Sequence, residues 1–284
     1  MERPKLIYKY CPVNLNSLRI LINREIYLGS LENLNDPFEG EFRIKQLDTL
    51  PNEELLTEFY DLSEKRSSLW LAEQLKKVKE QPTLFYEDFR LWAQNQINTQ
   101  YGISCFSAKT DNNLMWSHYA ARHTGFIIMF DTEALVRDIC KHRTEDLTIK
   151  LDKVTYLSEL PEATPVFTET QLSFDTPEEI CTTKQKEWEY EGEWRFYSHL
   201  PPTWLKFRGF QFNEECIKGI IFGTKIAEDD QKLILRAIES NPDYRVEFYL
   251  AKKDLQTGLI KAENKIIGRF RNGKFFDSGH TRNK

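Results

Sequence analysis

Within residues 184–197, charged and apolar side chains alternate from Glu187 to Phe196, which predicts a β-strand, because successive strand residues point to opposite faces of a sheet. One predicted face is aromatic and consists of Trp188, Tyr190, Gly192, Trp194 and Phe196. The other face consists of Glu187, Glu189, Glu191, Glu193 and Arg195. The aromatic face is typical of a core. The charged face is either a solvated edge or the wall of a polar cleft, where nearby cations or a ligand would relieve the repulsion between carboxylates.

Other patterns predict strands and helices along the rest of the chain. A β-prone run at residues 6–10 is followed by a helical spacing at 15–23, with Asn14 as its N-cap, and by strand character at 25–30. Further strands are predicted at residues 102–107, 125–130, 150–157, 219–223 and 245–250, and an amphipathic helix at 229–240. Asn272-Gly273 predicts a type I′ hairpin turn. We therefore expect an α+β fold with a mixed, mainly antiparallel sheet and flanking helices.

Residues 52–100 have the pattern of two amphipathic helices that are separated near Gln81-Pro82. Apolar residues recur at three- and four-residue steps, and no reactive set converges there. These positions are Leu55, Leu56, Phe59, Leu62, Leu69, Trp70 and Leu75, and then Leu84, Phe85, Phe89, Trp92 and Ile97. We predict one domain over residues 1–284, in which this block is a helical insertion or a lid that covers the site without supplying chemistry.

The segment Asn33-Leu-Asn-Asp-Pro-Phe-Glu-Gly40 has the composition of a turn. Asn and Asp side chains bond to their own backbone, and Pro37 keeps Asp36 out of the helical region. Asp36, Glu39 and the aromatic Phe38 are candidate ligand-binding residues. The alternative is a tight structural connection that Asp36 caps.

Residues 114–123 are predicted to form a helix that Asp111 or Asn112 caps and that ends before Gly125. His118 and His123 lie about 140° apart around such a helix, so they do not form a metal pair, and no metal site is predicted. His118 would share a face with Arg122, and Tyr119 with His123. These residues, together with Trp116, are either a structural cluster or part of a site.

Composition narrows the class of protein. A net charge of −5 over 284 residues disfavours a global electrostatic grip on nucleic acid, although it leaves a local basic groove open. No signal peptide or membrane span is predicted. Five scattered cysteines without a C-x-x-C pair indicate reduced thiols, so we expect a cytoplasmic protein without a zinc knuckle or disulfide scaffold. The sequence does not fix the oligomeric state.

A series of motif segments runs through most of the chain. They are Leu6-Ile-Tyr-Lys-Tyr10, Ile26-Tyr-Leu, Asn35-Asp-Pro-Phe-Glu39, Cys105-Phe-Ser107, Met115-Trp-Ser-His-Tyr-Ala120 with His123 and Gly125, Val154-Thr-Tyr156, Lys184, and Trp188-x-Tyr-Glu-x-Glu-Trp-Arg195. In this order they resemble the bacterial proteins of unknown function grouped as the DUF2971 family. The block at 52–100 carries none of these motifs. The resemblance implies no established chemistry, so the function depends on the residues themselves.

If these motif segments meet in space, the carboxylates of 184–197 would face the helix that carries His118, Arg122 and His123. Opposed titratable groups between aromatic walls are typical of a catalytic or ligand-orienting cleft. The catalytic candidates are Glu191, Glu193, His118 and His123. The substrate-binding candidates are Tyr8, Lys9, Tyr27, Asp36, Glu39, Trp116, Arg122 and Arg195. The alternative is a buried polar network that holds the fold.

The preferred functional hypothesis is a nucleotide- or NAD-using transferase in defence or stress response. The strand–helix–strand opening and the later Glu-Gly-Glu are similar to the ADP-ribosyltransferase arrangement. That resemblance implies that Glu191 or Glu193 stabilises an oxocarbenium-like transition state and that Tyr8 or Tyr27 stacks on nicotinamide. The chain differs from that superfamily at Tyr8-Lys9-Tyr10, where the superfamily generally has His or Arg.

Two alternatives remain open. One is a magnesium-dependent phosphodiesterase or nuclease, with the carboxylates Asp36, Glu39, Glu191 and Glu193 assisted by His118 or Lys184. The other is a non-catalytic sensor or interaction module. The Gly-x-x-x-Gly at residues 219–223 is too short a pattern to indicate phosphate binding.

Overall fold

The computed structural model describes residues 2–61, 67–142, 147–263 and 268–277. The chain divides into two compact units. The first unit comprises residues 1–29, 102–154 and 187–284, and the second comprises 30–101 and 155–186. The first unit is built on a mixed sheet, and the second on helices with short strand pairs.

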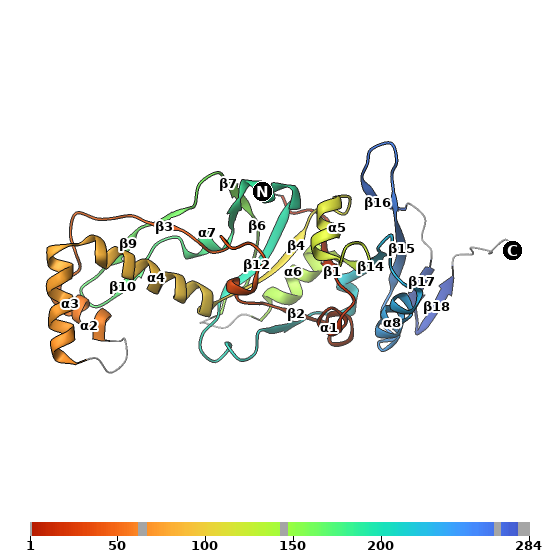
Figure 1. Ribbon diagram of the computed structural model, residues 1–284. Helices are drawn as coiled ribbons and strands as arrows, with labels where there is room; N and C mark the ends of the chain where they lie inside the picture. Colours follow the sequence, from red (N-terminus) through yellow and green to blue (C-terminus); the bar gives the residue numbers. More distant parts are fainter. Residues whose placement is uncertain (1, 62–66, 143–146, 264–267, 278–284) are drawn as a thin grey trace. The chain divides into compact units, whose positions relative to one another are not determined.

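A ten-stranded sheet forms the first unit (Figure 1). Its strand order is β18 (Lys274–Asp277), β17 (Gly268–Arg271), β15 (Val246–Lys253), β14 (Ile217–Phe222), β5 (Phe126–Asp131), β1 (Leu6–Cys11), β4 (Tyr101–Ser107), β12 (Glu193–His199) and β6 (Lys150–Lys153), and β16 (Ile260–Ala262) pairs with β15. The pairing of β14 with β15 is parallel, whereas β1 is antiparallel to both of its neighbours. The predicted α+β fold with a mixed, mainly antiparallel sheet is confirmed.

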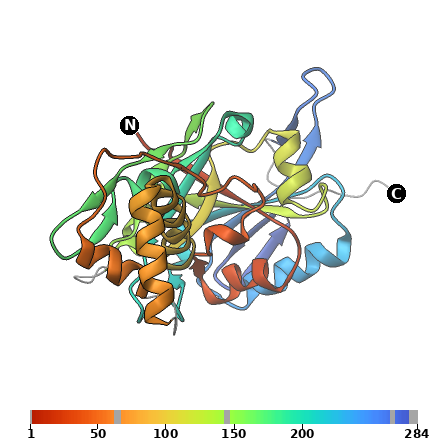
Figure 2. The same cartoon turned by 60° about the vertical axis from the view of Figure 1, so that its left-hand side comes forward.

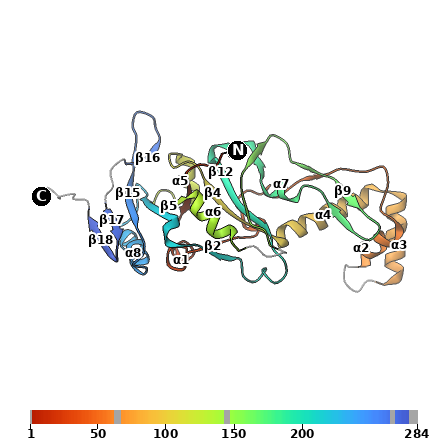
Figure 3. The ribbon, with the colours of Figure 1, turned by 180° about the vertical axis from the view of Figure 1, so that it is seen from behind.

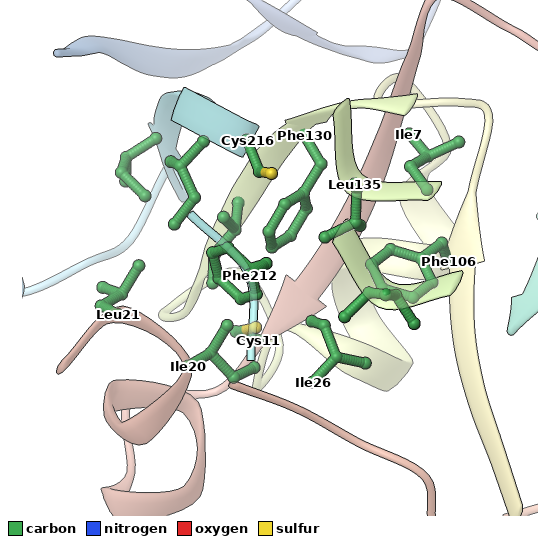
Figure 4. Close-up of a cluster of buried hydrophobic side chains, with 14 of the residues drawn as sticks. Ile7, Cys11, Ile20, Leu21, Ile26, Phe106, Phe130, Leu135, Phe212 and Cys216 are labelled. Carbon is green, nitrogen blue, oxygen red and sulfur yellow. The ribbon is translucent and has the colours of Figure 1, made fainter. Parts of the chain in front are cut away.

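Three helices cover one face of this sheet: α1 (Leu15–Asn23), α6 (Thr132–Cys140) and α8 (Glu228–Glu239) (Figures 2 and 3). Helix α8 is the crossover between the parallel strands β14 and β15. The apolar side chains of the helices and strands form one buried cluster, part of which is drawn in Figure 4. Leu21 of α1 and Leu135 of α6 belong to it, as do Ile7, Phe106 and Phe130 from three neighbouring strands. Each such side chain contributes about 1.5–3 kcal/mol on burial, so this layer fixes which strand residues face inward.

Local sequence chemistry explains where several elements begin and turn. The Asn14 side chain accepts a hydrogen bond from the Ser17 backbone N–H at 2.9 Å and caps α1, as predicted. Asp131 caps α6 in the same way. Asn272 and Gly273 have φ of 52° and 71°, as a type I′ turn requires, and join β17 to β18.

The opposite face of the sheet carries helix α5 (Asn113–Tyr119) (Figure 2). Met115 and Trp116 pack there with Tyr10 and other sheet residues in a second, smaller core cluster. Tyr8, Tyr119, Met129, Tyr190 and Tyr249 pack against this cluster while remaining partly exposed. This face is therefore the more polar one, and it carries the candidate site.

The second unit contains α2 (Glu53–Asp61), α3 (Ser68–Glu80) and α4 (Thr83–Gln100), with the hairpin of β9 (Pro165–Phe167) and β10 (Leu172–Phe174). Phe167 packs against Phe85 and Phe89 of α4, and Phe174 packs against Trp92 and Phe42. The unit also contains the short helix α7 (Pro177–Cys181) and two short parallel ladders: β3 (Arg43–Ile44) with β8 (Glu162–Ala163), and β7 (Thr155–Leu157) with β11 (Thr183–Gln185).

The predicted break at Gln81-Pro82 separates α3 from α4, as expected. The first predicted helix instead forms α2 and α3, and Leu62 lies outside the described residues. Leu69 was expected to face a core, but it is 82% exposed, so that position is wrong. The predicted block is one part of a larger unit, and its role as a lid remains a prediction.

The strand predicted over 184–197 is wrong at residues 186–192. Residues 186–191 form a 3₁₀ helix, η2 (Lys186–Glu191), and the strand β12 begins only at Glu193. Between them Gly192 has φ of 54°, which an extended strand does not allow. The predicted strand 150–157 is also divided, because β6 pairs with β12 whereas β7 pairs with β11.

Candidate functional site

A buried ion pair lies at the start of β12. Arg195 donates from Nε to Glu193 Oε1 at 2.8 Å and from Nη2 to Oε2 at 3.0 Å. The exposed fraction is 3% for Glu193 and 0% for Arg195. Since the two residues are separated by one position, they share a face, while Trp194 and Phe196 enter the core on the other face. The predicted alternation therefore holds for residues 193–196.

Cys105 of β4 lies beside this ion pair. Burial raises the pKa of the Cys105 thiol well above its usual value, the Glu193 charge adds to that effect, and the Arg195 charge opposes it. A thiol with a raised pKa stays protonated at neutral pH and is a poor nucleophile. Cys105 therefore acts as a weak hydrogen-bond donor to the carboxylate, and the chemistry of this site does not depend on a thiolate.

Glu191 is joined to helix α5 through Tyr119. The Tyr119 hydroxyl donates to Glu191 Oε1 at 2.6 Å, and Glu191 is only 2% exposed. That length is typical of a hydrogen bond to an ionised carboxylate. The backbone of Glu191 is fixed as well, because the Ser107 hydroxyl donates to its carbonyl oxygen at 2.5 Å. The structure thus brings one predicted carboxylate to the predicted helix, through a tyrosine between them.

Aromatic rings surround this contact. The His118 ring lies 6.3 Å from the Trp188 ring and 6.2 Å from the Tyr119 ring, measured between centroids. Trp188 in turn lies 6.0 Å from Tyr190. His118 is exposed, and Trp188 and Tyr190 are partly exposed, so these rings have accessible flat surfaces in the neighbourhood of Tyr119.

The helix predicted over 114–123 ends earlier than expected. Helix α5 stops at Tyr119, and Ala121, Arg122 and His123 have φ of 47°, 55° and 74°. These are left-handed values, so the predicted pairing of His118 with Arg122 and of Tyr119 with His123 along one helix is wrong. Asn112 caps the helix by accepting from Leu114 N at 2.8 Å, which confirms one of the two predicted caps.

His123 is positioned by this left-handed turn. Its Nε2 lies 3.2 Å from the Ser117 hydroxyl, and its ring stacks on Trp116 with a centroid separation of 6.5 Å. Burial and the charges of Lys225 and Lys253 lower the pKa of His123 below its ordinary value. His123 is therefore a neutral imidazole at pH 7 and lies next to two lysines.

Two glycines hold the turn against the sheet. A side chain at Gly125 would overlap the Cys11 carbonyl oxygen, and one at Gly223 would overlap the His123 carbonyl oxygen. The backbone N–H of Gly223 donates to Gly125 O at 2.9 Å, and that of Lys225 donates to His123 O at 3.0 Å. The close approach of these segments requires glycine at both positions.

Other predicted site residues of the first unit have structural positions. Lys9 lies on the helix-covered face of β1, where its Nζ donates to Ser104 Oγ at 3.1 Å and to the Cys105 carbonyl at 3.0 Å. Trp116 is fully buried, and its indole N–H donates to Thr110 O at 2.9 Å. Arg122 is exposed.

The two predicted stacking tyrosines are placed differently. Tyr8 is partly exposed on the polar face and packs against the same small core cluster as Tyr119 and Tyr190. Tyr27 is 59% exposed and belongs to β2 (Glu25–Tyr27), which pairs with β13 (Gly209–Gln211) outside the large sheet. Tyr8 is therefore the better candidate of the two.

Asp36 and Glu39 belong to the second unit. Asp36 Oδ1 accepts from the Phe38 backbone N–H at 2.9 Å, which supports the structural alternative for this turn. Glu39 Oε2 lies 3.9 Å from Lys184 Nζ, and the side chains of Asp36, Glu39 and Lys184 are all buried.

Within the described ranges of the chain, no three His, Cys, Asp or Glu side chains come together as metal ligands would. No helix in those ranges has the length and apolar composition of a membrane span.

Several contributing residues were missed by the sequence analysis. Tyr119 lies on the predicted helix and Cys105 in a motif segment, but neither pattern assigns the residue to a site. Lys225 and Lys253 had no signal in the sequence, because they approach His123 from segments about 100 and 130 residues away along the chain. Only the tertiary fold identifies them.

The residues of the candidate site, from His118 to Glu193, lie in the part of the chain between α5 and β12. Residues 115–196 match the family model described as Protein of unknown function (DUF2971). This supports the resemblance, and the match covers less than half of the chain. It includes His118, Tyr119, His123, Glu191 and Glu193. The family description names no activity. No curated protein and no solved structure matches the chain.

Proposed function

We propose that the protein is an NAD- or nucleotide-using transferase, similar to ADP-ribosyltransferases, that acts at the centre formed by Glu191, Tyr119, His118 and Trp188. The observation that carries this proposal is the 2.6 Å bond from the Tyr119 hydroxyl to a buried Glu191 carboxylate. A fixed carboxylate beside ring surfaces suits a ligand that combines a flat heteroaromatic group with a ribose.

In glycosyl transfer from NAD, the bond from ribose C1′ to the nicotinamide nitrogen breaks, and its electron pair leaves with nicotinamide. Positive charge develops on the ribose and is quenched when an acceptor nucleophile adds to C1′ and releases a proton. A preorganised negative group beside that charge stabilises the transition state. In the proposal Glu191 is that group, and Tyr119 fixes its orientation.

The neighbouring side chains have supporting roles in this mechanism. Trp188 and Tyr190 stack on the nicotinamide or base, as does Tyr8. His118 is exposed and takes the proton of the acceptor. Glu193 and Arg195 are positioning residues, because their buried ion pair fixes the start of β12, which lies two residues after Glu191.

The test is calorimetric titration with NAD, ATP and magnesium, followed by an assay of nicotinamide release. Glu191→Gln should lower turnover by roughly 10²-fold, the scale of losing one preorganised electrostatic group. Tyr119→Phe removes only the hydroxyl and should have a smaller effect of the same sign. Glu189→Gln is the matched control, because Glu189 is an exposed carboxylate of the same 3₁₀ helix, and it should leave turnover unchanged.

Two results would contradict the proposal. One is the absence of heat and turnover with both NAD and ATP, and the other is an equal loss in Glu189→Gln and Glu191→Gln. Heat with magnesium alone would favour the phosphodiesterase alternative instead. Thermal melts of each variant separate lost chemistry from lost folding.

A further inference from the structure

A cavity of about 310 Å³ lies beside the end of α5. Four stretches of the chain form its wall: Asn113 at the start of α5, the left-handed turn, the loop between β14 and α8, and the stretch from the end of β15 to the start of β16. His123, Thr224, Lys225 and Lys253 are among the residues that line it. The cavity is thus a product of the tertiary fold, and it involves none of the carboxylates assigned to the transferase centre.

The charges around this cavity are predominantly positive. Within the described part of the chain, the ion pairs of the β15–β16 connection are Lys252–Glu263 and Lys261–Asp254, and neither Lys225 nor Lys253 takes part in one. Asp254 also lines the cavity. Its negative charge is offset by the charge of Lys261, whose Nζ lies 2.6 Å from Asp254 Oδ2. That lysine and backbone N–H groups hold the pKa of Asp254 below its usual range. The cavity therefore carries the charges of Lys225 and Lys253, which form no ion pair within the described residues, beside an Asp254 carboxylate that is paired with Lys261.

Two buried polar atoms at the cavity lack a partner. His123 Nδ1 and Thr224 Oγ1 are buried, and no hydrogen bond to either atom is found among the residues that the structure describes. Leaving such atoms unsatisfied costs free energy, which a ligand with hydrogen-bonding oxygens would recover. With His123 neutral, Nδ1 can donate to such an oxygen when Nε2 accepts from the Ser117 hydroxyl.

The backbone that presents His123 is strained. Three consecutive residues without glycine, Ala121 to His123, have φ between 47° and 74°. Non-glycine residues rarely adopt these values, and such strain concentrates at ligand sites where the surrounding structure enforces it. Here the bond from Lys225 N to His123 O, at 3.0 Å, joins the strained turn to the loop that carries Thr224 and Lys225. This bond therefore holds the imidazole of His123 and the segment of Lys225 at one cavity, which Lys253 also lines.

We infer that this cavity binds the phosphate group of a phosphorylated small molecule. Two unpaired lysines with neutral imidazole and hydroxyl donors are suited to a tetrahedral oxyanion. The volume lies at the lower end of the range for small-molecule sites, so it leaves room for part of the group that the phosphate is attached to. The inference does not depend on the proposed transferase activity, because it is carried by other residues.

The experiment is calorimetric titration of the full chain with inorganic phosphate and with pyrophosphate at low ionic strength. Lys225→Ala and Lys253→Ala should each weaken binding by about tenfold, the effect of one lost charge-assisted contact. The matched control is Lys252→Ala, which removes the same charge from the adjacent position of β15, where Lys252 is paired with Glu263. It should change the affinity by less than about twofold.

A second readout is the histidine resonance of His123 in a proton NMR titration. Bound phosphate should raise the pKa of His123, because a nearby negative charge stabilises the imidazolium. This shift should be lost in Lys253→Ala and kept in Lys252→Ala. The inference is overturned if neither anion binds at millimolar concentration, or if Lys252→Ala weakens binding as much as the two cavity variants do. It is equally overturned if phosphate binds without moving the His123 titration.

Discussion

Replacing Glu193 by Gln tests whether this carboxylate is structural or chemical. The change keeps the size and shape of the side chain and removes its negative charge. In the wild-type protein both carboxylate oxygens accept from Arg195, at 2.8 and 3.0 Å, and the guanidinium is fully buried. Glu193→Gln therefore leaves a buried cation without its bidentate partner.

The expected loss of unfolding free energy is about 3–5 kcal/mol, as for other buried pairs from which one partner is removed. Coulomb's law gives a similar magnitude, since unit charges about 4 Å apart at an effective dielectric constant of 20 interact by about 4 kcal/mol. For a chain of this size, each kcal/mol corresponds to roughly 2–4 °C in Tm, so we expect a decrease of roughly 6–20 °C.

The assay is a thermal melt followed by circular dichroism, run beside nicotinamide release. Glu189→Gln, which removes an exposed carboxylate, should stay within about 0.5 kcal/mol of the wild type. The reasoning is refuted if Glu193→Gln melts like Glu189→Gln. If it did so while losing turnover by roughly 10²-fold, Glu193 would be the reacting carboxylate in place of Glu191.

Three further predictions concern the left-handed turn. Gly125→Ala should destabilise the protein by about 3 kcal/mol or more in a urea titration, because the new methyl group would overlap the Cys11 carbonyl oxygen. Gly258→Ala, where the glycine has positive φ and open space around it, should cost only about 1 kcal/mol in the same titration. Ala121→Gly should raise the free energy of unfolding by about 0.5 kcal/mol, since glycine accepts φ of 47° without strain, and a lower urea midpoint would contradict this. Because the pKa of His123 is lowered in the folded state, the unfolded state binds more protons below about pH 6.5, and the free energy of unfolding should fall as pH decreases through that range. His123→Gln should remove this part of the pH dependence, which urea titrations at about pH 7 and pH 5 would measure.

Sequence alone determined the features that depend on neighbouring residues. The cap at Asn14 and the turn at Asn272-Gly273 were predicted correctly, and Asn112 was one of the two residues predicted to cap α5, because each feature depends on one side chain and the backbone beside it. The α+β class and the break between α3 and α4 followed from periodicity and from a proline.

The tertiary structure decided the features in which local preference is overridden. Alternation predicted one strand over 184–197, but Gly192, with φ of 54°, ends η2. The Gly192 carbonyl oxygen accepts from Ala108 N at 3.0 Å, and Glu191 turns toward Tyr119. Likewise the sequence at Ala121 to His123 favours a continued helix, yet contacts through Gly125 and Gly223 enforce the opposite handedness.

The candidate site shows the same division. Its carboxylates and histidines were visible as residue types, whereas the partners Tyr119, Cys105, Lys225 and Lys253 depend on contacts between distant segments. Residue type and periodicity are local properties, so they predict which side chains are available. Which of them meet is set by long-range packing and by backbone hydrogen bonds, which outweigh local preferences of about 1–2 kcal/mol per residue.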